Sequence, residues 1–239
     1  VATTGGNTTV EQMAFDQELT ISGKNRTLGA GNNNDDQTFG TVTVSNTTAV
    51  AGDTAFDITL ANTARVDGVL TVGNLVIDGA DNDITTLNLE SAGLRNTANV
   101  VAEFNGADVT RLNLVGSQDL SIHVATIAAG AAVDAVVNAA ALTGDLVLAV
   151  NGAELDGDAD DELIGTAGAR DLLALYGDVT TNTDVSGFET VQFGWLAGSD
   201  LDDVFAAPRD ASGQFDAGNT AGVNTYIVGN VGNVPAAEF

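Results

Sequence analysis

The sequence lacks several features that would place it in common protein classes. It contains no cysteine, so a small domain held together by disulfides is excluded. Only 7 Lys and Arg stand against 33 Asp and Glu, which gives a net charge of −26. Nucleic acids and anionic membranes bind cationic surfaces, so neither is expected as a direct partner. No apolar run approaches the roughly 20 residues of a membrane-spanning helix, and we expect no membrane insertion.

Proline and aromatic residues are also scarce, with 2 Pro and an aromatic content of 5% among 239 residues. The hydrophobic content of 44% still supports a packed interior, but much of it is Ala and Val. The sequence therefore predicts a core of thin layers built from small side chains. The chain starts VATTGG, without Met or a recognisable signal, and we expect it to be an internal segment of a longer protein.

Short segments that alternate apolar and polar residues dominate what is present. They are rich in Val, Ile, Thr and Leu and are bounded by Gly, Asn or Asp, a pattern typical of β-strands. The clearest examples lie at residues 41–44, 56–60, 120–124, 146–148 and 190–193. One Ala-rich segment, residues 127–141, leaves a short helix open as an alternative. The chain is predicted to be all-β.

A repeat occurs within this pattern. The phrase DITTLNL at residues 83–89 matches DVTRLNL at residues 108–114, and FETVQF at residues 188–193 resembles a looser third copy. One strand phrase in each repeat of about 20–30 residues is typical of a stacked solenoid. We therefore predict a parallel β-helix or β-solenoid with Gly/Asp-rich calcium turns. A β-sandwich, which also contains short alternating strands, is the alternative.

The densest chemical feature is the acidic run ELDGDADDE at residues 154–162, which contains no cation. Crowded carboxylates repel one another unless a cation lies between them, and hard oxygen ligands on a glycine-containing turn suit Ca²⁺. The spacing only begins an EF-hand loop, and the Gly/Asp nonapeptide turn fits better. In that alignment Arg170 occupies a later ligand position and predicts a turn without metal. A solvated acidic loop is the alternative.

Weaker Gly/Asp turns precede other β phrases, at residues 78–83 and 198–205. Together with the acidic run they define the candidate calcium ligands, which are Asp81, Asp83, Asp156, Asp158, Asp160, Asp161, Asp200, Asp202 and Asp203. Acidic residues scattered over the surface as an adaptation to high salt would be a further explanation. The clustering of the acids at Gly-bearing turns counts against it.

Three phrases resemble the repeat-in-toxin (RTX) superfamily, and in particular surface-layer (S-layer) proteins of the Caulobacter type. They are GTAGARDLL at residues 165–173, VSGFETV at residues 185–191 and NAAALTG at residues 138–144. The resemblance implies a calcium-dependent β-solenoid over residues 71–239, with residues 1–70 either its first β region or a small separate domain. It also implies type I secretion, a place at the bacterial cell surface and assembly into a lattice.

The sequence contains no recognisable catalytic constellation, although carboxylate pairs are plentiful. The single His, His123, lies between Ile122 and Val124 in an alternating segment and is expected to point outward, while Trp195 is expected to pack or to lie at an interface. Nothing around His123 resembles a nucleophile motif. We therefore expect a structural, self-assembling protein with no catalytic activity. A calcium-dependent adhesin that binds cell-surface polysaccharide and a polysaccharide-active β-helix enzyme are the competing hypotheses.

Overall fold

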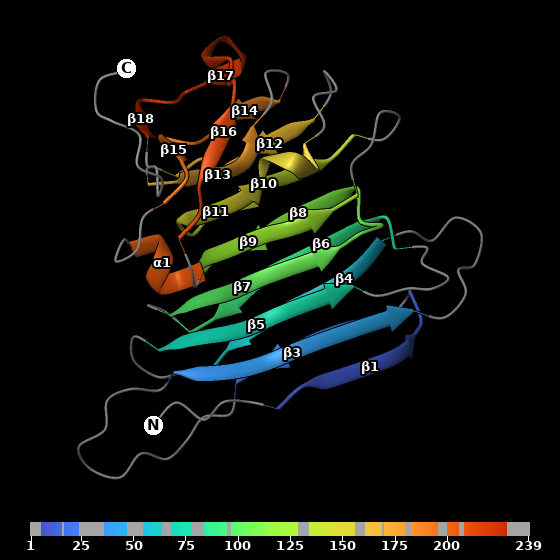
Figure 1. Cartoon of the computed structure of the whole chain (residues 1–239). Helices are drawn as coiled ribbons and strands as arrows, with labels where there is room; N and C mark the ends of the chain where they lie inside the picture. Colours follow the sequence, from blue (N-terminus) through green and yellow to red (C-terminus); the bar gives the residue numbers. More distant parts are fainter. Residues whose placement is uncertain are drawn as a thin grey trace.

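The structure of the protein is a computed structural model. It describes residues 6–15, 17–23, 36–46, 55–63, 68–77, 84–94, 97–128, 134–155, 161–168, 170–179, 183–195, 200–205 and 208–228. In these residues the chain is mostly β-strand and forms two parallel sheets (Figure 1). The all-β prediction is confirmed.

From β1 to β15, successive strands enter the two sheets in alternation. Sheet A has ten strands in the order β1-β3-β5-β7-β9-β11-β13-β15-β18, with β16 paired to β13. Its strands are β1 (Thr8–Met13), β3 (Gln37–Asn46), β5 (Val69–Ile77), β7 (Ala98–Gly106), β9 (Asp119–Ile127), β11 (Leu146–Asn151), β13 (Leu172–Val179), β15 (Thr190–Phe193), β16 (Ala211–Gly213) and β18 (Thr225–Val228).

Sheet B has eight strands in the order β17-β14-β12-β10-β8-β6-β4-β2. They are β2 (Glu18–Ser22), β4 (Ala55–Asn62), β6 (Thr86–Gly93), β8 (Arg111–Gly116), β10 (Val136–Leu142), β12 (Glu162–Ile164), β14 (Asp184–Ser186) and β17 (Thr220–Ala221). Three short helices complete the described structure, η1 (Gly152–Glu154), α1 (Asp200–Phe205) and η2 (Ala217–Asn219). The strands in Figure 1 follow one another from blue at one end to red at the other.

The period-2 pattern of the sequence places one face of each strand in the core. In β4, for example, Phe56, Ile58 and Leu60 are buried while the residues between them are more exposed. The inward residues of both sheets form one apolar cluster that extends along the whole stack. Neighbouring strands are in register, so like positions form columns, such as Ile122, Leu148, Leu173 and Val191 in sheet A.

The two clearest repeat phrases lie side by side. Strands β6 and β8 pair in parallel with Leu87 opposite Leu112 and Leu89 opposite Leu114. Between the leucines, the Asn113 side-chain amide donates a 2.8 Å hydrogen bond to Asn88 Oδ1. The phrase suggested as a third copy belongs instead to β15 in sheet A, so it does not continue this column.

Two local expectations need correction. Val136–Leu142 of the Ala-rich segment is strand β10, because it pairs with β8 and β12 and these pairs override the helix propensity of Ala. Residues 200–205 form helix α1, where a Gly/Asp turn was expected. Strand β5 spans the boundary expected at residues 70–71 and pairs with β3 before it, and β4 pairs with β6 across the same boundary. Within the described ranges, no helix is long and apolar enough to cross a membrane.

Candidate functional site

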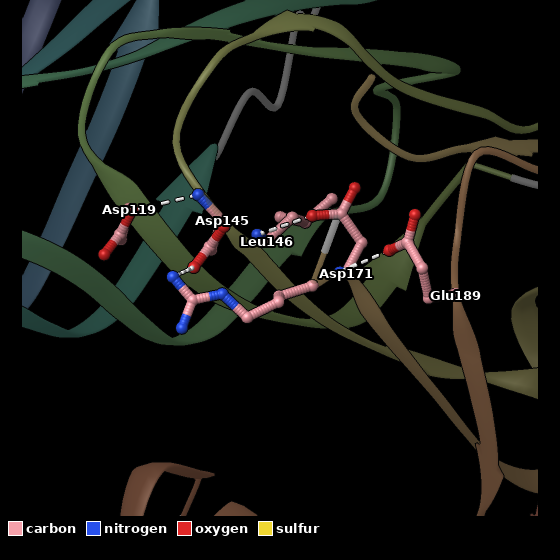
Figure 2. Close-up of polar contacts among 6 residues, drawn as sticks. Asp119, Asp145, Leu146, Asp171 and Glu189 are labelled. Atoms are coloured by element: carbon pink, nitrogen blue, oxygen red, sulfur yellow. Dashed lines mark hydrogen bonds and ion pairs between the residues drawn. The ribbon is translucent and has the colours of Figure 1, made fainter. Parts of the chain in front are cut away.

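Carboxylates line the amino ends of the strands in sheet A, and we call this set the carboxylate row. Asp119 begins β9, and Asp145, Asp171 and Glu189 directly precede β11, β13 and β15 (Figure 2). Each of these strands pairs with the next, so the four side chains belong to four adjacent strands. Asp36 takes the same position before β3 and accepts a 2.9 Å hydrogen bond from the Val69 N–H at the start of β5.

The row binds backbone groups of neighbouring strands. Asp119 Oδ1 accepts from the Asp145 N–H at 2.9 Å, and Glu189 Oε2 accepts from the Asp171 N–H at 2.7 Å (Figure 2). Asp119 and Glu189 thus each satisfy a donor at the start of an adjacent strand. A backbone N–H bound to an ionised acceptor makes one of the stronger hydrogen bonds in a protein.

Asp171 is the most buried member, with 1% of its surface exposed. Its Oδ1 accepts from the Leu146 N–H at 3.0 Å, and its Oδ2 accepts from the Thr166 N–H at 2.7 Å. One carboxylate therefore joins the start of β11 to the turn that follows β12. Both of its oxygens are engaged by the protein backbone.

One cationic side chain, that of Arg170, contacts the carboxylate row. Arg170 lies 3.2 Å from Asp145, and the two side chains are 81% and 38% exposed. Such an exposed pair contributes little to stability, about 0–1 kcal/mol. Arg170 does, however, place positive charge at the turn position where the nonapeptide pattern would have a calcium ligand.

The carboxylate row is not among the predicted sites, although the sequence carries a signal for it. The dipeptide Asp-Leu occurs at residues 119, 145, 171 and 200, and Asp119 and Asp145 are 26 residues apart. The first three copies start sheet A strands, with Asp at the turn and Leu at the first or second strand position, whereas the fourth starts helix α1. A search for recurring dipeptides at the repeat spacing would have found these residues.

Of the predicted calcium ligands, Asp161 is the one whose side chain is described. It is fully buried, and its Oδ1 accepts from the Ala135 N–H at 2.8 Å, ahead of the paired strands β12 and β10. Asp81, Asp83, Asp156, Asp158 and Asp160 lie outside the described residues. Asp200, Asp202 and Asp203 lie on α1. The structure therefore shows a backbone contact for Asp161. The grouping of the carboxylates of the acidic run around a calcium ion stays a prediction.

The described residues show how the acidic run begins and ends. Glu154, at its start, receives a 3.4 Å hydrogen bond from the Ile127 N–H, and burial raises the pKa of its carboxyl group, although this hydrogen bond opposes the rise. Among the residues that the structure describes, no three His, Cys, Asp or Glu side chains group in a way that could hold a metal. Asp161, at the other end, offers a buried carboxylate of the chemistry that Ca²⁺ prefers, with one oxygen already bound to backbone.

A second cluster lies on the outer face of sheet A, where α1 packs. It contains Tyr176, Trp195, Leu201 and Phe205, and Ala149 and Ala174 on the strands leave room for them. His123 joins this cluster, with its ring 5.8 Å from that of Phe205. The expectation that His123 points away from Ile122 and Val124 is right, but it is wrong about exposure, because only 1% of His123 is accessible.

Both ring nitrogens of His123 have partners. Nδ1 lies 3.2 Å from the Ala102 carbonyl and therefore carries the proton, so that Nε2 accepts from the Tyr176 hydroxyl at 2.6 Å. Burial lowers the pKa of His123, and the nearby Arg209 lowers it further, against the Ala102 contact and Glu103. Burial also raises the pKa of Tyr176 to about 12. The pair is a neutral hydrogen-bonded unit within an apolar cluster.

A hollow of about 390 Å³ lies where β12, β14 and β17 adjoin. Glu162 and Asp184 line it from directly opposed positions on β12 and β14, and Asn219 and Thr220 line it from the neighbouring segment. The carboxylate and amide oxygens in this hollow can accept hydrogen bonds from hydroxyl groups.

Comparison with family models, curated proteins and solved structures finds no match to this chain.

Proposed function

We propose that this chain is a structural, non-catalytic segment of a secreted bacterial surface protein, built as a calcium-stabilised β-solenoid that self-assembles. The observation that carries the proposal is the carboxylate row, in which Asp119, Asp171 and Glu189 each accept a hydrogen bond from the backbone of an adjacent strand, as Asp36 does before β3. In this arrangement the acidic side chains bind the backbone of stacked strands. Both ring nitrogens of His123 are engaged, by Ala102 and Tyr176, which supports a non-catalytic role.

The solenoid assignment is supported by topology. From β1 to β15, consecutive strands alternate between two sheets, and each sheet pairs its strands in parallel and in near-sequential order. A coil that contributes one strand to each sheet and then stacks on the previous coil produces this order. A β-sandwich of the immunoglobulin type has antiparallel sheets, so the parallel registers weigh against that alternative.

Calcium is proposed for the acidic run at residues 154–162. Asp161 would anchor this turn, since its Oδ1 is fixed by the Ala135 N–H beside the neighbouring coil. A bound Ca²⁺ would supply positive charge among the carboxylates that follow Glu154, whose raised pKa already reflects the cost of burying its charge. The phrases that resemble S-layer proteins favour the same ion.

Removal of calcium tests the proposal. In EDTA we expect the far-ultraviolet circular dichroism signal of the β-sheet to decrease and the melting temperature to fall, because carboxylate repulsion opposes stacking. Millimolar CaCl₂ should restore both, whereas the same concentration of MgCl₂ should restore less, because Mg²⁺ loses its hydration water reluctantly. A spectrum and a melting temperature that ignore EDTA would reject calcium-coupled folding.

Paired variants separate a specific site from a solvated loop. Asp158→Asn with Asp160→Asn should weaken calcium binding by at least about tenfold, measured by isothermal titration calorimetry, since each ligand loses its charge. Glu11→Gln with Glu18→Gln removes the same charge from β1 and β2, far along the stack, and should leave calcium affinity unchanged. Equal effects of the two pairs would identify nonspecific charge screening.

A glycan-binding role is the second candidate, and the hollow beside β12 favours it. Glu162 and Asp184 could accept hydrogen bonds from sugar hydroxyls there, and Asn219 could also donate them. Titration with cell-surface polysaccharide should then show saturable binding by single molecules of the protein, and Asp184→Ala should weaken it. Binding that the variant leaves unchanged would remove this candidate.

A further inference from the structure

The last strand of sheet A exposes side chains that elsewhere belong to the core. Three of the large apolar residues that are exposed in the described structure are consecutive in β18, namely Tyr226 at 42%, Ile227 at 42% and Val228 at 61%. Tyr226 is in register with Val191, and Val228 with Phe193. Tyr226 and Val228 therefore continue two interior columns that have no further strand above them in the described chain.

The backbone of β18 also directs N–H groups toward this open end of the sheet. Thr225 N–H donates to the Glu189 carbonyl at 3.0 Å, on the β15 side. Successive N–H groups of a strand alternate between its two edges, so the groups of Tyr226 and Val228 face away from β15. In the described residues β18 ends sheet A and is paired on its β15 side. The edge is thus a template for another strand.

The edge is held in a fixed conformation. The Tyr226 hydroxyl lies 2.7 Å from Thr220 Oγ1, and its ring is 6.5 Å from that of Phe215. The other end of sheet A differs, because β1 carries a bulge between Val10 and Met13, with Gln12 at a φ of 59°. Bulges and charges protect edge strands from pairing, so stacking of β18 on β1 of another copy is disfavoured.

We infer that β18 is the contact through which two copies of this chain join, edge to edge and antiparallel. A two-fold axis midway between the two Ile227 residues and normal to the sheet places Tyr226 of one copy opposite Val228 of the other. The outward N–H and C=O groups of these residues then form the hydrogen-bonded pairs of an antiparallel ladder. The same axis keeps both apolar faces on one side of the joined sheet, so the two cores become continuous. Closed two-fold contacts of this kind are the commonest in protein oligomers.

This inference rests on the proposed self-assembling role and names one of its contacts. The net charge of −26 on each copy opposes association, so we expect a dimer whose population rises with protein concentration and with salt. Sedimentation velocity of the whole chain with calcium present should show it. Ile227→Lys and Val228→Lys, which place charge at the centre of the edge, should each weaken dimerisation by at least tenfold.

Leu94→Lys is the matched control, because Leu94 is 50% exposed but directly follows β6, away from β18 in the order of strands. It should leave dimerisation unchanged, and circular dichroism should show that all three variants retain the fold. A chain that stays monomeric at every concentration would overturn the inference, and so would equal weakening by Leu94→Lys. Either result leaves the EDTA experiment intact, so the calcium-stabilised fold would be judged separately.

Cross-linking tests the symmetry directly, since the chain has no cysteine. In the proposed ladder the two Ile227 residues form a non-hydrogen-bonded pair, with Cα atoms about 4.5 Å apart, which a disulfide can bridge. Ile227→Cys alone should therefore form a covalent dimer under mild oxidation, and Leu94→Cys should not. Cross-linking that requires a mixture of Ile227→Cys and Thr9→Cys chains would show head-to-tail stacking and overturn the two-fold contact.

Discussion

His123 is neutral because it is buried in an apolar cluster, where burial lowers its pKa. Its Nδ1 donates to the Ala102 carbonyl, its Nε2 accepts from the Tyr176 hydroxyl, and Phe205 and Trp195 lie against its ring. A protonated imidazole here would lose its hydration without gaining an anionic hydrogen-bond partner. The lowered pKa of His123 expresses that cost.

This cost predicts a pH dependence with a definite sign. Folded His123 has a pKa below the 6.5 of an unburied His, so the unfolded chain takes up a proton first as the pH falls below 6.5. The free energy of unfolding should therefore be greatest above that pH and should decrease below it, by at most about 1.4 kcal/mol per pH unit for one proton. His123→Gln keeps a donor and an acceptor but does not titrate. Urea denaturation between pH 7 and pH 5 should show a shallower decrease for the variant, and parallel curves would contradict the explanation.

Asp171 predicts a different kind of loss. Asp171→Ala would leave the buried Leu146 and Thr166 N–H groups without their acceptor, at about 1–3 kcal/mol for each group. We expect the free energy of unfolding to fall by about 2–5 kcal/mol, measured by urea denaturation. Asp119→Ala is the control, because it removes a more exposed carboxylate with a single backbone contact and should cost about 1 kcal/mol or less. Similar losses in the two variants would show that burial of the N–H groups is not the cause.

Helix α1 is short, and it contributes to the free energy of unfolding through the side chains that it covers. Leu201 and Phe205 pack on Trp195 and Tyr176 over the outer face of sheet A. Phe205→Ala should cost about 3–4 kcal/mol if the helix stays in place, and less if it detaches. Because Trp195 is the single Trp of the chain and is fully buried, its fluorescence reports the difference. We expect a red shift of its emission with an unchanged far-ultraviolet β-sheet signal, whereas Val204→Ala, at a partly buried position, should shift it less.

The strands could be predicted from the sequence because their signal is local. Alternation of Leu or Val with polar residues gave the positions of β6 and β8, and the Leu-Asn-Leu phrase even gave their relative register. The cover over His123 could not be predicted, because it is formed by residues about 80 positions later in the chain (205 − 123 = 82). The carboxylate row escaped for a similar reason, since each N–H partner lies on a neighbouring strand and the Asp side chains carry no strand pattern of their own.

The whole molecule combines a strongly apolar interior with a strongly anionic surface. The 33 acidic residues include a few, such as Asp161 and Asp171, whose carboxylates are buried and bound to backbone. In the part of the chain that the structure describes, Arg170–Asp145 is the ion pair within 4.0 Å. Most of the negative charge is therefore balanced by solvent ions, and the stack is stable only to the extent that core burial exceeds this repulsion.

Repulsion of this kind predicts how salt and calcium differ. Raising NaCl from about 10 mM to about 500 mM shortens the Debye length from about 30 Å to about 4 Å, so the melting temperature should rise gradually over the whole range. Specific calcium binding should instead add a rise that saturates at millimolar CaCl₂ and persists in 500 mM NaCl, because coordinated ligands are screened little. Differential scanning calorimetry of both titrations separates the effect of charge screening from that of specific calcium binding. If the calcium effect disappears at high NaCl, screening alone stabilises the stack and the acidic run is a solvated loop.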